Sequence, residues 1–238
     1  TPTGDYRYLS GVVNGDSLKL STFDGAHAFL FTAKVNSDQQ ISGGMFYSGA
    51  THSEPWVAEK NEKASLPDVA GMYLKDGEER LNFRFLDLNK NHVSINDAKF
   101  RNKVVIIQIM GSWCPNCMDE TAFLSDYYNH NKQRGVEIIG LAYEYSTDFE
   151  RSKKSIQKFK DRFHVKYTLL NTGVTVSDSL RTERTLPQLT MIKSFPSTIF
   201  LEIEGRVAKL YAVFKFPGPG VHYEQKKIEC GAQVARLM

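Results

Sequence analysis

Two cysteines separated by two residues are the part of this sequence with the clearest chemistry. They lie in the run Trp113-Cys114-Pro115-Asn116-Cys117, directly after an apolar segment. At the start of a helix this spacing brings the two sulfurs within reach of a disulfide. The first thiol then faces unpaired N–H groups and the positive end of the helix dipole, which lowers its pKa. Pro115 suits the first helical position. The pattern predicts Cys114 as the attacking thiolate and Cys117 as the resolving thiol of a disulfide exchange.

Half of a zinc site is the other interpretation of this pair. Zinc needs two more Cys or His ligands, usually as a second close pair. The six histidines are scattered along the chain and Cys230 is isolated. This favours redox chemistry, and we expect no metal and no cofactor. Cys230 shares one stripe of the last expected helix with Val234 and Leu237, which predicts a buried, inert thiol.

The elements that must position the pair follow from apolar patterning. Residues 104–110 form a nearly continuous apolar run, typical of a strand buried on both faces. A helix with apolar residues at helical spacing follows the cysteines. The remaining elements alternate as expected for an α/β domain: a strand at 136–143, a basic helix at 151–166, a strand at 167–170, a helix near 185–193, strands at 197–202 and 207–214, and a helix at 222–237. We interpret the cations of 151–166 as a solvated face, with docking of an acidic partner as the alternative.

The N-terminal part has a different pattern. Residues 6–47 contain short strand-like segments separated by turn formers such as Asn14-Gly15-Asp16, which predicts antiparallel hairpins. The polar stretch 48–68 is interpreted as a linker. We therefore expect a β-rich domain with its linker over residues 1–66 and an α/β domain over residues 67–238. Aromatic side chains alternate along the expected strands, which favours core over a binding groove for Phe29, Phe31, Phe46, Tyr47 and Trp56.

Composition narrows the classes of partner. The 238 residues are 41% hydrophobic and 24% charged, as in ordinary globular proteins. A net charge of +3 is too small for a dedicated nucleic-acid binder. The run 104–110 is far shorter than the roughly 20 residues of a membrane-spanning helix. We expect neither nucleic-acid binding nor membrane insertion. No charged-then-apolar leader is present, as expected if a targeting segment has been removed.

Five segments together resemble the thioredoxin-like thiol-disulfide oxidoreductases of the TlpA/ResA type, in the AhpC/TSA-thioredoxin superfamily. They are 85–88, 93–95, 103–107, 111–120 and 195–200, and the resemblance extends over about residues 72–238. It implies a thioredoxin-like fold, with a central mixed sheet flanked by helices, and a cis peptide bond before Pro196. It also implies a substrate-binding surface made by Phe195 and Pro196 beside Trp113, with Pro115 and Asn116 between the cysteines.

Glu120 lies three residues after Cys117, so helical spacing puts both on one face. The TlpA/ResA type often has a glutamate there. A partly buried carboxylate with a raised pKa would exchange a proton with Cys117; a solvated glutamate favoured by the helix dipole is the equal alternative. Gln108 is neutral where thioredoxin has a buried acid, which leaves proton handling to Glu120. Glu144 is a weaker candidate, expected at the surface.

The resemblance implies an enzyme that exchanges its dithiol with disulfides of partner proteins, as a reductase recharged by a membrane thiol donor. It also implies a location outside the cytoplasm, in the periplasm or envelope. Two alternatives stay open. A peroxiredoxin-like peroxidase has Thr or Ser three residues before its reactive cysteine, where this chain has Gly111. A non-catalytic protein would bind partners through the N-terminal domain and keep a vestigial dithiol.

Overall fold

The computed structural model describes residues 9–23, 28–37, 40–63, 71–211 and 221–237, with only the helical backbone for 221–227. The chain divides into two compact units, Thr1–Asp68 and Val69–Met238. Three expectations fall on other residues: most of a strand at 6–9, the boundary at 66, and the end of a strand at 212–214. They lie outside the described residues. Each unit is considered by itself.

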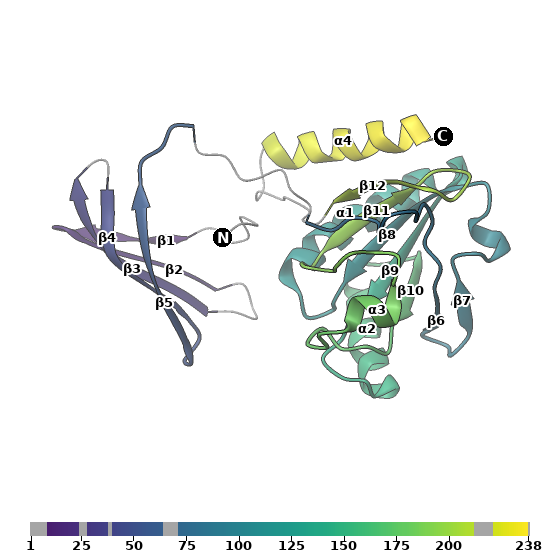
Figure 1. Cartoon of the computed structure of the whole chain (residues 1–238), viewed down its shortest axis with the longest axis horizontal. Helices are drawn as coiled ribbons and strands as arrows, with labels where there is room; N and C mark the ends of the chain where they lie inside the picture. The colour runs from purple at the N-terminus through teal and green to yellow at the C-terminus, as the bar shows by residue number, and fades with distance from the viewer. Residues whose placement is uncertain (1–8, 24–27, 38–39, 64–70, 212–220, 238) are drawn as a thin grey trace. The chain divides into compact units, whose positions relative to one another are not determined.

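The first unit is an antiparallel meander of five strands in sequence order (Figure 1). Its strands are β1 (Ser10–Asn14), β2 (Ser17–Phe23), β3 (Ala28–Ser37), β4 (Gln40–Ser48) and β5 (His52–Glu59). Asn14 pairs with Ser17 across a two-residue turn, where Gly15 has a φ of 61° that suits glycine. The predicted hairpins are confirmed.

The linker predicted for residues 48–68 was wrong in its first half, which contains β5. This strand pairs with β4 from Ser48↔His52 to Gln40↔Glu59. Most of its side chains are polar and exposed, so it carries no apolar alternation, and its backbone pairing alone identifies it.

Among the aromatic residues of the first unit, Phe46 is buried and stacks on Phe31 at 4.6 Å between ring centroids, whereas Tyr47 points to the other face and is exposed.

The second unit has a seven-stranded mixed sheet in the order β12-β11-β8-β9-β10-β6-β7. Its central strands β8 (Val104–Met110), β9 (Val136–Ala142) and β10 (Thr168–Asn171) are parallel. Antiparallel strands complete both sides: β11 (Ser197–Leu201) and β12 (Val207–Tyr211) beside β8, and the hairpin β6 (Arg84–Asp87) and β7 (His92–Ser94) beside β10.

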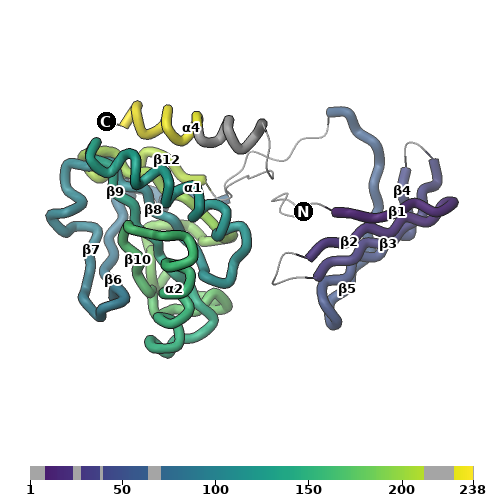
Figure 2. Tube along the Cα trace, turned by 180° about the vertical axis from the view of Figure 1, so that it is seen from behind, coloured from purple at the N-terminus to yellow at the C-terminus, as the bar shows by residue number. Residues whose placement is uncertain are grey.

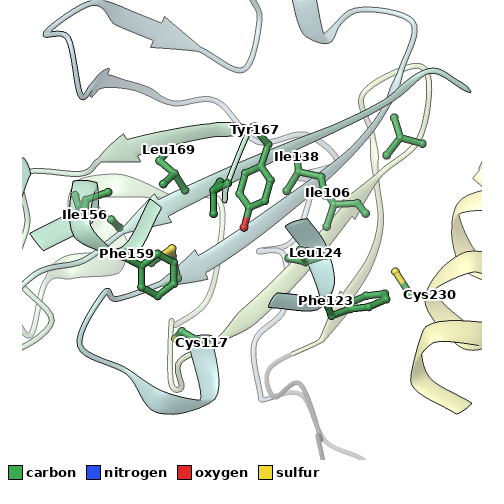
Figure 3. Packing of buried hydrophobic residues seen from close by; sticks show 14 of the residues in the cluster. Ile106, Cys117, Phe123, Leu124, Ile138, Ile156, Phe159, Tyr167, Leu169 and Cys230 are labelled. Carbon is green, nitrogen blue, oxygen red and sulfur yellow. The ribbon is translucent and has the colours of Figure 1, made fainter. Parts of the chain in front are cut away.

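The sheet is covered on both faces, and β8 is buried along its whole length. Ile106 and Met110 of β8 pack in one layer with α1 (Pro115–Asn131), α2 (Phe149–Arg162) and α4 (Val221–Leu237), and Figure 2 shows α1 and α2 in front of the sheet. Ile107 and Ile109 face the other side, with α3 (Arg181–Thr185) and its neighbouring segments. Figure 3 shows the first of these two layers. The second unit thus has the predicted thioredoxin-like fold, a mixed sheet flanked by helices.

The helix predicted near 185–193 was wrong in position. Helix α3 ends at Thr185, and Leu186 leaves the helical region with φ −134° and ψ 66°. The cause is local, because the ring of Pro187 disfavours the helical conformation of the residue before it. Leu186, Leu189 and Ile192 then pack into the core from an irregular segment. Their spacing resembles that of a helix, which misled the prediction.

Candidate active site

The two cysteines lie where β8 gives way to α1. Cys114 is the N-cap of α1, with an extended backbone, and Pro115 and Asn116 form the first turn. The backbone N–H of Cys117 donates to the sulfur of Cys114 at 3.3 Å. A side chain that accepts from this turn satisfies one of the donors that a helix start leaves unpaired. The predicted position at the helix start is therefore the one observed, and both cysteines are free thiols.

The two thiols have opposite environments. Cys114 is 4% exposed and Cys117 is fully buried. A hydrogen bond from the Cys117 side chain lowers the pKa of Cys114; burial opposes this, and backbone donors at Cys117 and Asn116 add to it. Burial, together with that same hydrogen bond and the Cys114 charge, raises the pKa of Cys117 well above its ordinary value. The pair thus has one sulfur with a small exposed fraction that ionises more readily than an ordinary thiol, and one fully buried sulfur that keeps its proton.

Phe195 and Pro196 approach the pair from a segment distant in sequence. The peptide bond between them is cis, as predicted. The Cys114 thiol contacts the carbonyl oxygen of Phe195 at 3.5 Å. The Phe195 ring is half-buried and lies 5.8 Å from the Trp113 ring and 5.5 Å from that of Tyr143. The structure therefore brings Phe195 and Trp113 together beside the sulfur of Cys114.

Trp113 is fixed by both its polar and its apolar atoms. Its indole N–H donates to the carbonyl of Tyr143 at 2.9 Å, and its ring lies 4.9 Å from that of Tyr145. Gly111 is required beneath it, since a Cβ there would lie 2.2 Å from the indole nitrogen. Tyr143 and Tyr145 follow β9, so the end of this strand sets the position of the tryptophan.

Glu120 is fully buried on the face of α1 that carries Cys117. This burial excludes the interpretation of Glu120 as a solvated residue. It accepts a hydrogen bond from the Gln108 amide at 2.8 Å and another from the Thr198 hydroxyl. Burial raises its pKa to about 7, and these two hydrogen bonds partly oppose the rise. A carboxyl group with this pKa exists in both protonation states near neutral pH.

Gln108 is the centre of a buried polar network behind the dithiol. Its amide also donates to Thr121 at 3.0 Å, and its oxygen accepts from Tyr167 at 3.3 Å. Burial raises the pKa of Tyr167, which keeps this phenol neutral. Sequence reasoning missed Thr121, Tyr167 and Thr198. Thr198 had a signal, because it lies two residues after Pro196 on the strand beside β8.

The expectation that Glu144 lies at the surface was wrong. It is 5% exposed, and its carboxylate accepts from the Ser112 N–H at 2.9 Å and from the Ser112 hydroxyl at 2.7 Å. Burial raises its pKa, and the two hydrogen bonds oppose the rise. Glu144 was expected to be solvated because it ends a strand, but the segment before Trp113 folds over it. It holds this segment in place.

Cys230 is not brought to the dithiol. It lies on α4 among core side chains such as Phe123 (Figure 3), is 6% exposed, and has a pKa raised by burial to about 12. The prediction of a buried thiol is confirmed.

Within the described ranges, no three His, Cys, Asp or Glu side chains are grouped so as to hold a metal ion. No helix in the described part of the chain is long and apolar enough to cross a membrane.

Comparison with known proteins gives consistent results. The profile of the AhpC/TSA family matches residues 77–222, more than half of the chain. The thiol-disulfide oxidoreductase ResA of Bacillus subtilis is 25% identical over 137 residues, which are 58% of this chain and 67% of that protein. The ResA of Halalkalibacterium halodurans is 24% identical over 136 residues, 57% and 67% of the two chains. A secreted Mycobacterium tuberculosis disulfide oxidoreductase, homologous to E. coli DsbE, aligns with a TM-score of 0.47 and 19% identity over 65% of this chain and 96% of that one.

Proposed function

The chain belongs to the AhpC/TSA family and is a thioredoxin-like oxidoreductase of the ResA/TlpA type, and we propose that it reduces disulfides of partner proteins with the pair Cys114 and Cys117. The observation that carries the proposal is the asymmetry of the two thiols at the start of α1: Cys114 keeps a small exposed fraction and has a lowered pKa, and Cys117 is fully buried with a raised pKa. We assign catalysis to a domain at residues 67–238, and a separate β-rich domain to residues 1–66.

In the first step the Cys114 thiolate attacks one sulfur of the partner's disulfide. A bond forms between that sulfur and Cys114, the partner's S–S bond breaks, and its second sulfur leaves as a thiolate that takes a proton. The thiolate is the nucleophile, so a lowered pKa at Cys114 increases its fraction at neutral pH. The hydrogen bond from the Cys117 N–H further stabilises the charge before the attack.

In the second step Cys117 loses its proton and attacks the sulfur of Cys114. The mixed disulfide breaks, the partner leaves with two thiols, and the chain keeps a disulfide; two electrons have passed to the partner. Cys117 is fully buried, so its proton needs an acceptor inside the protein. Glu120 is proposed for this role, because it lies on the same helical face and its pKa of about 7 suits proton transfer near neutral pH.

The partner's backbone is proposed to lie along Phe195 and Pro196, with Trp113 on one side. The Phe195 carbonyl is 3.5 Å from the Cys114 sulfur and offers an acceptor to a bound peptide. Pro115 and Asn116 form the turn between the sulfurs and are proposed to complete this surface, with Asn116 partly exposed and Pro115 buried beneath it. An extended segment bound there would present its disulfide to Cys114.

A chain that acts as a reductase must regain two electrons after each cycle. We propose a membrane-bound thiol donor for this purpose, and a location outside the cytoplasm in the periplasm or envelope. The names of the ResA relatives support thiol-disulfide chemistry in general. The direction of electron flow, from this chain to its partner, is proposed.

The test traps the mixed disulfide in the native host. In Cys117→Ala the second step is blocked, so partners should remain bound to Cys114 and be released by dithiothreitol. The matched control is the double variant Cys114→Ala/Cys117→Ala, which should capture none. Capture of the same proteins by the control would assign binding to other parts of the chain. Peroxide turnover by the wild type well above that of free thiol, without trapped partners, would assign peroxidase chemistry instead.

A further inference from the structure

A pocket of about 370 Å³ opens beside the active-site tryptophan, where the ends of β8 and β9 meet α2. Its apolar wall is made by Trp113, Met118, Tyr145, Phe159 and Phe163. This volume is at the low end of the ~300–1,000 Å³ found for ligand pockets and is enough for a few side chains. An apolar wall of this kind favours an occupant with apolar surface.

The rim of the pocket is basic. Arg151, Ser155, Lys158 and Arg162 line it from α2, and their spacing of four, three and four residues puts them on one stripe of the helix. Among the described residues, none of the three cations forms an ion pair with a carboxylate. Three cations against the single carboxylate of Glu144 in the lining leave an excess of positive charge, which favours an anionic group in the pocket.

One acidic side chain, Glu144, also lines the pocket, and its carboxylate already accepts two hydrogen bonds. The two carboxylate oxygens of Glu144 accept from the N–H and the hydroxyl of Ser112. It thus forms no pair with the cations of α2. An incoming carboxylate would have Arg151, Lys158 and Arg162 as its available partners, with the hydroxyls of serines that line the pocket, such as Ser155, as further donors.

The pocket neighbours the reacting sulfur through Trp113, although Cys114 itself does not line it. Trp113 is the residue before Cys114 and forms the wall between them, and the Tyr145 ring lies 4.9 Å from its ring. Burial raises the pKa of Tyr145, and a charge on Cys114 raises it further, as expected for neighbouring groups. A peptide that crosses Trp113 from the Cys114 side would place the side chains next to its cysteine in the pocket.

We propose that this pocket selects protein substrates whose disulfide is flanked by an acidic and an apolar side chain, the carboxylate bound by Arg151, Lys158 and Arg162. This inference rests on the proposed exchange at Cys114 and adds the class of substrate. The cations on α2 are then a specificity surface rather than a solvated face, and a basic segment is disfavoured at the same place.

The experiment uses the full chain, reduced, and two peptides activated as 2-thiopyridyl disulfides at a central cysteine. One peptide carries glutamates and a leucine beside the cysteine, and the other carries lysines at the same glutamate positions. The Cys114 thiolate attacks the peptide sulfur, an S–S bond forms between them, and thiopyridone leaves with its electron pair and takes a proton. Its absorbance gives the second-order rate constant. We expect the acidic peptide to react about 10-fold faster at low salt, with the ratio decreasing as salt is added.

Charge reversal at the pocket is compared with the same reversal elsewhere. Arg151→Glu/Lys158→Glu should remove or invert the preference for the acidic peptide. The matched control Lys154→Glu/Lys166→Glu has the same net charge, and its exposed side chains do not line the pocket. It should keep most of the preference. Circular dichroism of both variants checks that the fold is retained.

Each outcome gives a separate answer. Equal rates for the two peptides in the wild type, or an equal loss of preference in both double variants, would refute the pocket as the source of selectivity. Oxidised glutathione, a small anionic disulfide, reacting as fast as the acidic peptide would also refute a protein substrate for the pocket. Absence of thiopyridone release from either peptide, with Cys114→Ala behaving as the wild type, would instead refute the proposed exchange itself.

Discussion

The buried carboxyl group of Glu120 makes the stability of the second unit depend on pH, and Glu120→Gln removes this dependence. Its pKa of about 7 lies about 2.5 above the ordinary value of 4.5. At ~1.36 kcal/mol for each pKa unit, the difference corresponds to about 3 kcal/mol. The folded chain binds this proton more tightly than the unfolded chain, so the stabilising contribution is complete below about pH 4.5. It decreases as pH rises through 7 and changes little above that pH.

The assay is guanidinium unfolding of Glu120 and Glu120→Gln proteins between pH 4.5 and 7.5. Both carry Trp56→Phe, so that Trp113 is the only tryptophan and reports on the second unit alone. Both also carry Ala at Cys114 and Cys117, so that no active-site thiol titrates.

The causes of the Glu120 pKa are burial and the hydrogen bonds from Thr198 and Gln108, none of which involves a sulfur. An amide at position 120 changes these hydrogen bonds by an amount that does not depend on pH. The free energy of unfolding of the glutamate protein should therefore fall by about 3 kcal/mol relative to the glutamine protein across this range. A difference between the two proteins that stays constant with pH would refute the raised pKa, and with it the case for Glu120 as the proton acceptor.

Three further outcomes are expected in the second unit. Gly111→Ala should displace the Trp113 indole, because the new Cβ would lie 2.2 Å from its nitrogen; we expect a loss of about 1–3 kcal/mol in urea unfolding and a changed tryptophan emission spectrum. Glu144→Ala should leave the Ser112 N–H without its acceptor and lower the free energy of unfolding by about 1–3 kcal/mol, measured in the same way. A loss below about 0.5 kcal/mol would contradict the role of Glu144 in holding the segment before Trp113. Cys230 should resist iodoacetamide at pH 8 in the native protein, since its pKa is raised to about 12, and mass spectrometry should find it modified only after unfolding.

Features set by neighbouring residues could be predicted from the sequence. The dithiol at the start of a helix follows from a buried apolar run, a short turn and a proline at the first helical position, all within about fifteen residues. The hairpin of β1 and β2 follows in the same way from its turn residues Asn14-Gly15-Asp16. Such signals are local, so no knowledge of the tertiary fold is required to read them.

Features that depend on residues distant in the sequence could not be predicted from the sequence alone. Glu120 is buried because Thr198, 78 residues away, closes over it, and Glu144 is buried by Ser112, 32 residues before it. Both acids have the same appearance in the sequence as solvated ones. Strand β5 was not predicted for the opposite reason, since most of its side chains are exposed and only its backbone pairing with β4 defines it.

In the proposed exchange, the order of the two steps follows from the way the thiols share one hydrogen bond. The Cys117 side chain donates to Cys114, and this bond lowers the pKa of Cys114 and raises that of Cys117. The two titrations are therefore a property of the pair, and the first proton is lost from Cys114. Once Cys114 is in a mixed disulfide it can carry no charge, so both its hydrogen bond and its repulsion cease to hold the proton on Cys117. Burial then remains the main barrier, and a carboxyl group titrating near pH 7 in the same interior is suited to accept that proton. In the proposed mechanism, loss of the Cys117 proton is therefore easier once a partner is bound to Cys114.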